Sequence, residues 1–565
     1  MQRYRRISAT AVVFLVLMLI SLPAVARPGR PAGKQGQAPK ATKQAQPADE
    51  PSTILTDGIS RELYDNDALF AQLSSAKQMQ LERFFGPKTH RRSEPGQDTL
   101  PYPQNVASKT AITDVLVNNP ATDTNQFTQS ETSCLVAGTN VVVAFNDSGS
   151  DINGMNHFTG YSLSTDGGAT FTDKGVLPAS TAGDAGDPVL ARDNTTGAVY
   201  LVTLGFTQGN LIQFFKSTDS GATFSAPISA TPGQRTGDSM DKEWVTVDNF
   251  AGTGQGNIYH FWRNFGGGTM GNGMRFTRST DGGSTFTPTR PWVTIEASAG
   301  QGAFPAVGPD HAVYCFWLST GNIIKVRKST DLGVTFGLAT TVYPCISQGV
   351  NGDLGLSPGF RSNTFPQVVV NPTNANQVFM SVADKGPGND KANIFLLMST
   401  DGGSTWGTPV TVNDDATTTD QWQPSLAISP DGTRLFVGYY SRQNDPGSNL
   451  MIDNYARVGT VSAGGVAFDP AQRLSSVSFP AAFGNDPVVN GVYMGDYDHS
   501  TGDASNFYHS WGDNRNRNFN NTRNQPDVFF AKVAVGQAGP GVDTLGAVDT
   551  TSANYFLRNS NTPGN

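Results

Sequence analysis

Charged residues are scarce in this 565-residue chain, at 15%, and only three cysteines are present. So few cysteines exclude a disulfide-rich scaffold. We expect Cys315 and Cys345 to be free thiols rather than a disulfide pair, because buried cysteines commonly act as small apolar residues. The net charge of −8 argues against a nucleic-acid partner, since nucleic acid selects a basic surface. The six histidines are scattered and show no zinc-ligand spacing.

A long apolar run is missing apart from the first 26 residues. There, Arg3, Arg5 and Arg6 precede an apolar stretch over 11–22, and small residues occupy 24–26. This pattern predicts a signal peptide over 1–26, and the apolar stretch is too short for a comfortable membrane span. We therefore expect a secreted, periplasmic or cell-surface protein with no integral membrane segment after cleavage.

Three further regions differ in composition from the long central part of the chain. Residues 27–56 are rich in Pro, Gly, Ala, Lys and Gln, which predicts a disordered linker. Residues 57–110 carry apolar residues at helical spacing and then an extended, proline-punctuated stretch, which predicts a helical and extended N-terminal segment. It would either pack on the main domain or act as a pro-segment. Residues 536–565 are predicted to be a flexible tail.

One octamer occurs five times in the central part, with the pattern Ser-Thr-Asp-x-Gly-x-Thr followed by Phe or Trp. The copies cover 164–171, 217–224, 279–286, 329–336 and 399–406. Aspartate accepts hydrogen bonds from nearby backbone N–H groups, and glycine allows a positive φ angle. Runs with strand character precede four of the five copies, so each octamer is predicted to be the tip of a β-hairpin.

The residues between the octamers divide 111–535 into seven similar units. Each unit shows two strands before the hairpin, although the last two units lack the octamer. Four strands per unit, repeated around an axis, predict a seven-bladed β-propeller of four-stranded antiparallel blades, with six blades as the alternative. The last unit ends after its third strand near Val533. The apolar stretch 111–117 is predicted to supply the fourth strand and so close the ring.

The octamers resemble the Asp-box, or BNR repeat, of the sialidase (neuraminidase) superfamily. The resemblance spans about 131–533, and its last two units resemble those of bacterial exported sialidase-like proteins. It implies a glycan-directed propeller whose boxes lie on the face opposite the active site. In that family three arginines bind the substrate carboxylate, a Tyr activated by a Glu attacks the sugar, and an Asp acts as acid and base. The family's Arg-Ile-Pro segment before the first box is missing here.

Candidate site residues follow from the position of each strand in its unit. Starts of first strands and ends of second strands should share the face opposite the hairpin tips. The catalytic candidates, with roles implied by the resemblance, are Glu131, Asp187, Glu243, Tyr440 and Tyr497. The substrate-binding candidates are Arg263, Arg361, Arg442, Arg515 and Asp513. We expect no cofactor and no bound metal, with Ca²⁺ held by Asp496, Asp498 and Asp513 as the alternative.

Two functions therefore remain open at the level of the sequence. The first is a secreted glycoside hydrolase of exo-sialidase type, which acts on terminal acidic sugars of a glycan or glycoprotein. The second is a non-catalytic propeller that binds glycan or protein at the cell surface. The substrate, the linkage, the oligomeric state and the role of the N-terminal helices are not fixed by the sequence.

Overall fold

The protein is described here from a computed structural model. It describes residues 58–86, 88, 112–123, 127–150, 157–180, 183–205, 212–235, 237–266, 272–347, 354–357, 359–386, 388–481, 486, 489, 494–517, 524–536, 544–549 and 554–558. The predicted signal peptide and linker lie outside these residues, as does much of the tail.

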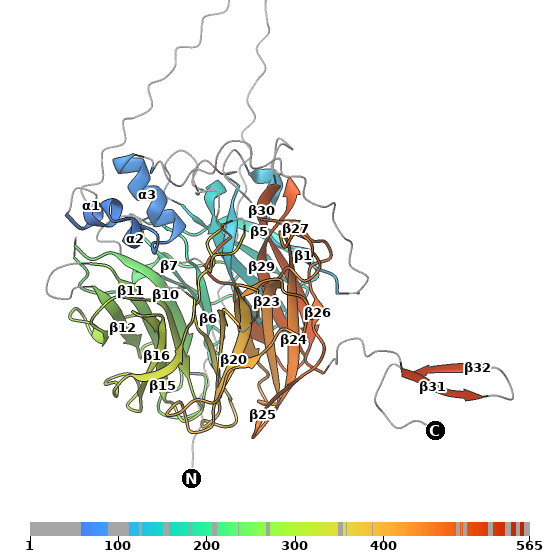
Figure 1. The fold of residues 1–565 in the computed structure, drawn as a ribbon. Helices are drawn as coiled ribbons and strands as arrows, with labels where there is room; N and C mark the ends of the chain where they lie inside the picture. The colour runs from blue at the N-terminus through green and yellow to red at the C-terminus, as the bar shows by residue number, and fades with distance from the viewer. Residues whose placement is uncertain are drawn as a thin grey trace, which may run out of the picture. The chain divides into compact units, whose positions relative to one another are not determined.

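Seven antiparallel blades built on four strands each form most of the described part of the chain, so the predicted seven-bladed propeller is confirmed (Figure 1). Blade 1 consists of β2 Gln129–Ala137, β3 Asn140–Asp147, β4 Thr159–Ser164 and β5 Thr172–Val176. Blade 2 consists of β6 Val189–Arg192, β7 Val199–Leu204, β8 Ile212–Ser217 and β9 Ile228–Ser229. Blade 3 consists of β10 Met240–Val247, β11 Ile258–Asn264, β12 Gly273–Ser279 and β13 Val293–Glu296. Blade 4 consists of β14 Gly300–Val307, β15 Val313–Ser319, β16 Ile323–Ser329 and β17 Thr340–Pro344.

The remaining blades vary this plan. Blade 5 consists of β18 Gln367–Val370, β19 Val378–Asp384, β20 Asn393–Ser399 and β21 Val410–Thr411. Blade 6 consists of β22 Gln421–Ile428, β23 Arg434–Ser441, β24 Met451–Ser462 and β25 Gly465–Phe468, and two short strands, β26 Gln472–Arg473 and β27 Phe479–Pro480, also pair with β24. Blade 7 consists of β28 Ser500–Gly502, β29 Asn506–Arg517, β30 Asn524–Ala534 and β1 Val115–Leu116.

The blades are strands because their middle segments are β-branched, aromatic and apolar without interruption. β3 has the sequence NVVVAFND, and its six central residues are all buried. Such continuous apolar runs are typical of strands that are covered on both faces, since each blade is packed between two neighbours. The first strands of neighbouring blades contact one another all round the ring, including β28 with β2.

Ring closure joins the two ends of the propeller sequence. Val115 and Leu116 of β1 pair antiparallel with Phe530 and Phe529 of β30, so a strand from before blade 1 completes blade 7. This confirms the predicted closure. A 3-10 turn, η2 Pro120–Thr122, follows β1, and a second, η3 Ser148–Ser150, follows β3. A separate two-stranded hairpin, β31 Thr544–Asp549 and β32 Asn554–Arg558, lies in the tail.

Every octamer connects the third and fourth strands of its blade, as predicted for a hairpin tip. In the last copy, Asp401 Oδ1 accepts hydrogen bonds from the backbone N–H groups of Ser404 (3.0 Å) and Thr405 (2.8 Å). Its Oδ2 accepts one from the Thr405 hydroxyl at 2.6 Å. These hydrogen bonds, the Thr405 side chain first, lower the pKa of Asp401 to about 2. Hydrogen bonds between residues of the octamer itself therefore hold the turn.

Three short helices precede the propeller: α1 Gly58–Asp65, α2 Asp67–Phe70 and α3 Ser75–Phe85. Side chains cap two of them, because Asn66 accepts from the first N–H groups of α2 and Ser74 accepts from Lys77 N in α3. Figure 1 shows these helices above strands β7, β10 and β11. The predicted short helical extension is therefore present, and α3 is buried from Ser75 to Leu81. The three cysteines are free.

Candidate functional site

The first strands of several blades begin with a β-bulge that places one residue at positive φ. The register shifts near the start of β2, β10, β14 and β22, and the left-handed residues there are Glu131, Lys242, Gly302 and Gln423. Asp187, immediately before β6, has the same conformation. A bulge redirects side chains relative to the regular pleat, and it is common next to active sites. Here it brings charged side chains of different blades together.

Six charged residues from blades 1, 2, 3 and 7 form one buried group, which we call the axial cluster. Its members are Glu131, Asp187, Asp241, Lys242, Glu243 and Asp496, and none is more than 6% exposed. Five carboxyl groups and one amine therefore share a region of low solvent access. Burial of so many ionisable groups is costly, so those without compensation are kept neutral.

Glu131 and Asp187 form a carboxyl pair at the boundary between blades 1 and 2. The Glu131 oxygens accept hydrogen bonds from Asn146 Nδ2 at 2.6 Å and from the backbone N–H of Asp496 at 2.9 Å. Asp187 N donates to Asn146 Oδ1 at 2.6 Å, so Asn146 holds both members. Burial first, and then the nearby Glu131 carboxylate, raises the pKa of Asp187 well above its usual range. Asp187 is thus a neutral acid beside Glu131.

Glu243 is the second neutral acid of the axial cluster. Its side chain is fully buried, and neither carboxyl oxygen has a hydrogen-bond partner in another of the described residues. Burial raises its pKa well above the ordinary value, and the charge of Asp241 adds to this shift. A buried carboxyl group that keeps its proton at neutral pH is the usual form of a general acid.

Lys242 lies against aromatic rings instead of in a surface ion pair. Its Nζ is 3.9 Å from the ring centroid of Tyr497 and 4.3 Å from that of Trp244. Burial lowers the pKa of this amine, and the carboxyl groups of the axial cluster, Asp187 first, oppose that shift. The Tyr497 hydroxyl donates to the carbonyl of Pro188 at 3.2 Å, and burial raises its pKa. The predicted Glu131, Asp187, Glu243 and Tyr497 are therefore brought together.

Two of the predicted arginines border the axial cluster. Arg361 Nη2 lies 2.5 Å from Asp496 Oδ2, in an ion pair whose two side chains are only 12% and 5% exposed. Arg263 is directly opposite Asp241 in the pairing of β10 with β11. Burial lowers the pKa of Arg263 to about 9, and the charge of Asp241 opposes this shift. Asp241 and Asp496 in turn have pKa values raised by burial, to about 6 and about 7.

Residues 72–74, between α2 and α3, cover this charged region. Ser74 N donates to Asp241 Oδ2 at 2.7 Å, and Gln301 Nε2 donates to the carbonyl of Gln72 at 2.9 Å. Arg361 Nη1 donates to the carbonyl of Leu73 at 2.6 Å. The backbone of three consecutive residues thus satisfies polar side chains from blades 3, 4 and 5.

The other predicted residues bind partners of their own away from these contacts. The Tyr440 hydroxyl donates to the carbonyl of Gly512 and accepts from its N–H, each at 3.0 Å. Arg442 lies over the rings of Phe360 and Trp422 and 3.5 Å from an oxygen of Asp420.

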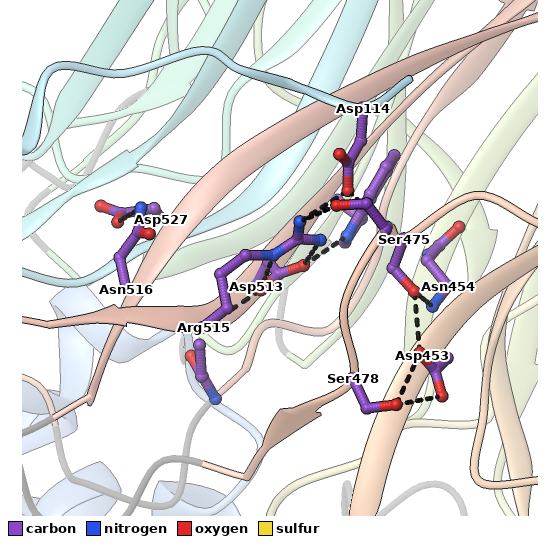
Figure 2. Close-up of polar contacts among 12 residues, drawn as sticks. Asp114, Asp453, Asn454, Ser475, Ser478, Asp513, Arg515, Asn516 and Asp527 are labelled. Carbon is purple, nitrogen blue, oxygen red and sulfur yellow. Dashed lines mark hydrogen bonds and ion pairs between the residues drawn. The ribbon is translucent and has the colours of Figure 1, made fainter. Parts of the chain in front are cut away.

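Arg515 and Asp513 form a buried ion pair with each other. Arg515 Nε and Nη2 donate to the two oxygens of Asp513 at 2.9 and 2.5 Å, and Nη1 lies 2.6 Å from Asp114 Oδ2 (Figure 2). Asp114 directly precedes β1, so this pair links β29 to the closing strand. Figure 2 also shows Asp453 of β24 in contact with Ser475 and Ser478, which belong to a neighbouring network in blade 6.

The alternative Ca²⁺ site has its three aspartates bound to different protein groups. Asp496 pairs with Arg361, Asp513 pairs with Arg515, and Asp498 accepts from Thr132 and Gln423 at 3.0 Å each. Within the described ranges, no group of three or more His, Cys, Asp or Glu residues is arranged to hold a metal ion. A Ca²⁺ ion therefore stays an untested prediction.

Sequence reasoning missed Asp241, Lys242, Gln301 and residues 72–74. Asp241 and Lys242 had a usable signal, because with Glu243 they form three consecutive charges at a strand start in a chain poor in charge. Gln301 and residues 72–74 had none. Their role depends on which backbone atoms the helical segment presents to the propeller.

No protein-family model and no curated protein matches this chain. Solved structures similar to it include a protein of unknown function from Dyadobacter fermentans, with 16% identity, a TM-score of 0.39 and coverage of 60% of this chain and 95% of that one. A Hadza microbial sialidase shows 16% identity and a TM-score of 0.38, over 61% of this chain and 66% of that one. An α-L-arabinofuranosidase from Fusarium graminearum shows 12% identity and a TM-score of 0.37, over 65% and 99%.

These similarities are too low to assign an activity to the chain. Membrane insertion through a helix is not indicated either, since each helix among the described residues is too short or too polar to span a bilayer. Any statement about function therefore rests on the chemistry of the axial cluster.

Proposed function

We propose that the protein is a glycoside hydrolase that acts on terminal acidic sugars of glycans or glycoproteins at the axial cluster. The observation that carries the proposal is one buried group that holds the carboxyl groups of Glu131, Asp187 and Glu243, with the pKa values of Asp187 and Glu243 raised by burial. Glycoside hydrolysis requires one carboxylic acid that protonates the leaving oxygen and one carboxylate that acts as base or nucleophile.

In this proposal Glu243 is the general acid and Glu131 is the base or nucleophile. Glu243 retains its proton because it is buried and its carboxyl group has no partner in another residue within the described part of the chain. Glu131 is oriented by Asn146 and by the N–H of Asp496, and Asp187 holds a proton beside it. Tyr497 is a weaker candidate for the nucleophile, because its hydroxyl already donates to Pro188 and its pKa is raised.

The preference for an acidic sugar comes from the two arginines. Arg361 and Arg263 lie next to the acidic groups, and a guanidinium matches a carboxylate in charge and in hydrogen-bond geometry. We further propose export from the cell on the basis of the predicted signal peptide over 1–26.

The test is the release of a fluorophore from a sialoside and a glucuronide, with a galactoside as the neutral control. It uses the wild type and a Ser74→Pro variant. Proline has no N–H, so this variant removes the hydrogen bond to Asp241 and weakens the attachment of the loop that covers the charged region. We expect release from the acidic substrates only, and a loss of roughly 10²–10⁴-fold in Glu243→Gln. Glu296→Gln is the matched control, because Glu296 lies in β13, partly exposed, beside Lys325. Failure of both proteins to release either acidic sugar would contradict the proposal.

A non-catalytic propeller that binds glycan at the same place is the second candidate. The Tyr497 hydroxyl favours it, because this hydroxyl donates to the carbonyl of Pro188 and is not paired with a carboxylate of the described residues that would activate it as a nucleophile. Binding of acidic sugars without any release, by both the wild type and the Ser74→Pro variant, would select this function.

A further inference from the structure

Three consecutive backbone groups of the helical segment are bound by side chains from three different blades. Asp241 accepts from Ser74 N, Gln301 donates to Gln72 O, and Arg361 donates to Leu73 O. Asp241 and Gln301 are themselves joined, since Gln301 Nε2 lies 3.3 Å from Asp241 Oδ1. These three side chains thus form one polar surface that presents an acceptor, a neutral donor and a cationic donor.

We propose that residues 72–74 are an internal ligand of this surface, and that Asp241, Gln301 and Arg361 bind an acidic sugar when the loop moves away. The inference rests on the proposed function and adds to it a closed state and a subsite. A sugar hydroxyl would donate to Asp241 in place of Ser74 N, and a hydroxyl or ring oxygen would accept from Gln301 in place of Gln72 O. A carboxylate would replace the Leu73 carbonyl on Arg361, in a stronger, charge-assisted contact.

The apolar contacts of the loop allow this exchange. Leu73 is fully buried, but among the described buried residues its cluster consists of Leu63, Phe70 and Leu81 of the helical segment and one propeller residue, Phe265. Leu73 thus contributes mainly to the internal packing of the segment. In contrast, α3 is anchored, because Ala76 and Met79 belong to the large core of the propeller. The proposed movement is therefore that of the loop, while α3 stays attached.

A closed state follows from the burial of the axial cluster. Glu131 and Glu243 are 0% exposed, so any reaction at these groups requires a covering element to move. Among the described residues, the loop contacts Asp241 of the axial cluster and Arg361 beside it directly. A closed conformation lowers the apparent affinity for a ligand by the fraction of molecules that are open.

Ser74 permits a matched pair of variants. Both Ser74→Ala and Ser74→Pro remove the hydroxyl that caps α3, but only proline also removes the N–H bound by Asp241. The φ angle of Ser74 is −57°, which lies within the range that proline adopts. Any difference between the two variants therefore reports on the contact with Asp241 and not on the cap.

Binding of N-acetylneuraminate and glucuronate to full-length protein is measured by calorimetry, with galactose as the neutral control. We expect Ser74→Pro to bind the acidic sugars about tenfold more tightly than Ser74→Ala, since opening becomes easier. Faster amide hydrogen exchange at Gln72 and Leu73, with unchanged exchange inside α3, should accompany the gain. Equal affinities of the two variants would overturn the proposal, as would a gain for galactose of the same size.

Arg361→Gln in the Ser74→Pro background should abolish the gain. If that variant does not fold, because Asp496 loses its partner, Gln301→Met removes a neutral donor and serves the same purpose. If Ser74→Pro itself does not fold, amide hydrogen exchange of the wild type is measured instead. Acidic sugars should then accelerate the exchange of the loop amides, and galactose should not. Free acidic sugars that bind and open the loop, together with no fluorophore release from the sialoside or the glucuronide, would refute the proposed activity and leave this inference standing.

Discussion

The fourth and fifth residues of each octamer adopt positive φ, yet only the fifth is always glycine. The fourth position is Gly in three copies and Ser220 or Leu332 in the others, at φ 58° and 59°. The fifth residue faces the preceding blade: a Cβ added to Gly283 would lie 2.4 Å from a ring carbon of Phe214 in blade 2. A residue with a side chain is therefore tolerated at the fourth position, where only the backbone is strained. At the fifth position a side chain would also clash with the preceding blade, so glycine is required.

This difference predicts the effect of two neighbouring substitutions. Gly282→Ala should cost about 1 kcal/mol in the free energy of unfolding, because only the left-handed backbone is penalised. Gly283→Ala should cost an additional 1–3 kcal/mol or so, because Phe214 must also move. Denaturant unfolding of both variants measures the difference. Equal costs would show that contact between the blades does not determine the glycine.

The closing strand is the element on which the ring depends. β1 is only two residues long, and the ion pair of Arg515 with Asp114 reinforces its two backbone pairs with β30, while Asp513 in the same strand as Arg515 holds the guanidinium. Asp513 is fully buried and binds Arg515 through both oxygens, while Asp114 contributes one oxygen and is 6% exposed. Arg515, which is predicted to bind substrate, instead connects β29 to the residue before β1, and Asp513 orients it.

An unequal loss of stability is expected when each of these carboxylates is replaced. Asp513→Asn should reduce the free energy of unfolding by roughly 3 kcal/mol, since a buried guanidinium loses its two-oxygen partner. Asp114→Asn should cost about 1 kcal/mol, because an amide oxygen can still accept and Asp513 remains. Thermal and denaturant unfolding test the order. The reverse order would mean that Asp114 is the main partner in closing the ring.

At the scale of the whole molecule, the buried acids make stability depend on pH. Burial raises the pKa of Asp241 to about 6, of Asp496 to about 7 and of Asp498 to about 8. Between pH 4 and 8 the unfolded chain loses these protons before the folded protein does, so stability falls as pH rises. The octamer aspartates act in the opposite direction below pH 4, since the pKa of Asp401 is lowered to about 2.

We therefore expect the melting temperature to be highest in mild acid and to fall by a few degrees between pH 5 and pH 8. Differential scanning calorimetry across this range measures the slope. Asp498→Asn, which keeps an oxygen acceptor for Thr132, should flatten it. A melting temperature that rises from pH 5 to pH 8 would show that these acids are ionised in the folded protein.

The sequence by itself determined the repeat, the hairpins and the ring closure, because each depends on local chemistry or on a pattern that recurs along the chain. Aspartate, glycine and threonine within eight residues are sufficient to build the turn, and five copies fix the phase of the blades. That phase also placed Glu131, Asp187 and Glu243 at one end of the ring. Only the tertiary structure showed that Arg361 borders the axial cluster, whereas Arg442 and Arg515 bind partners elsewhere. Their partners are buried groups far away in sequence, and only packing decides which carboxylate or carbonyl each guanidinium meets.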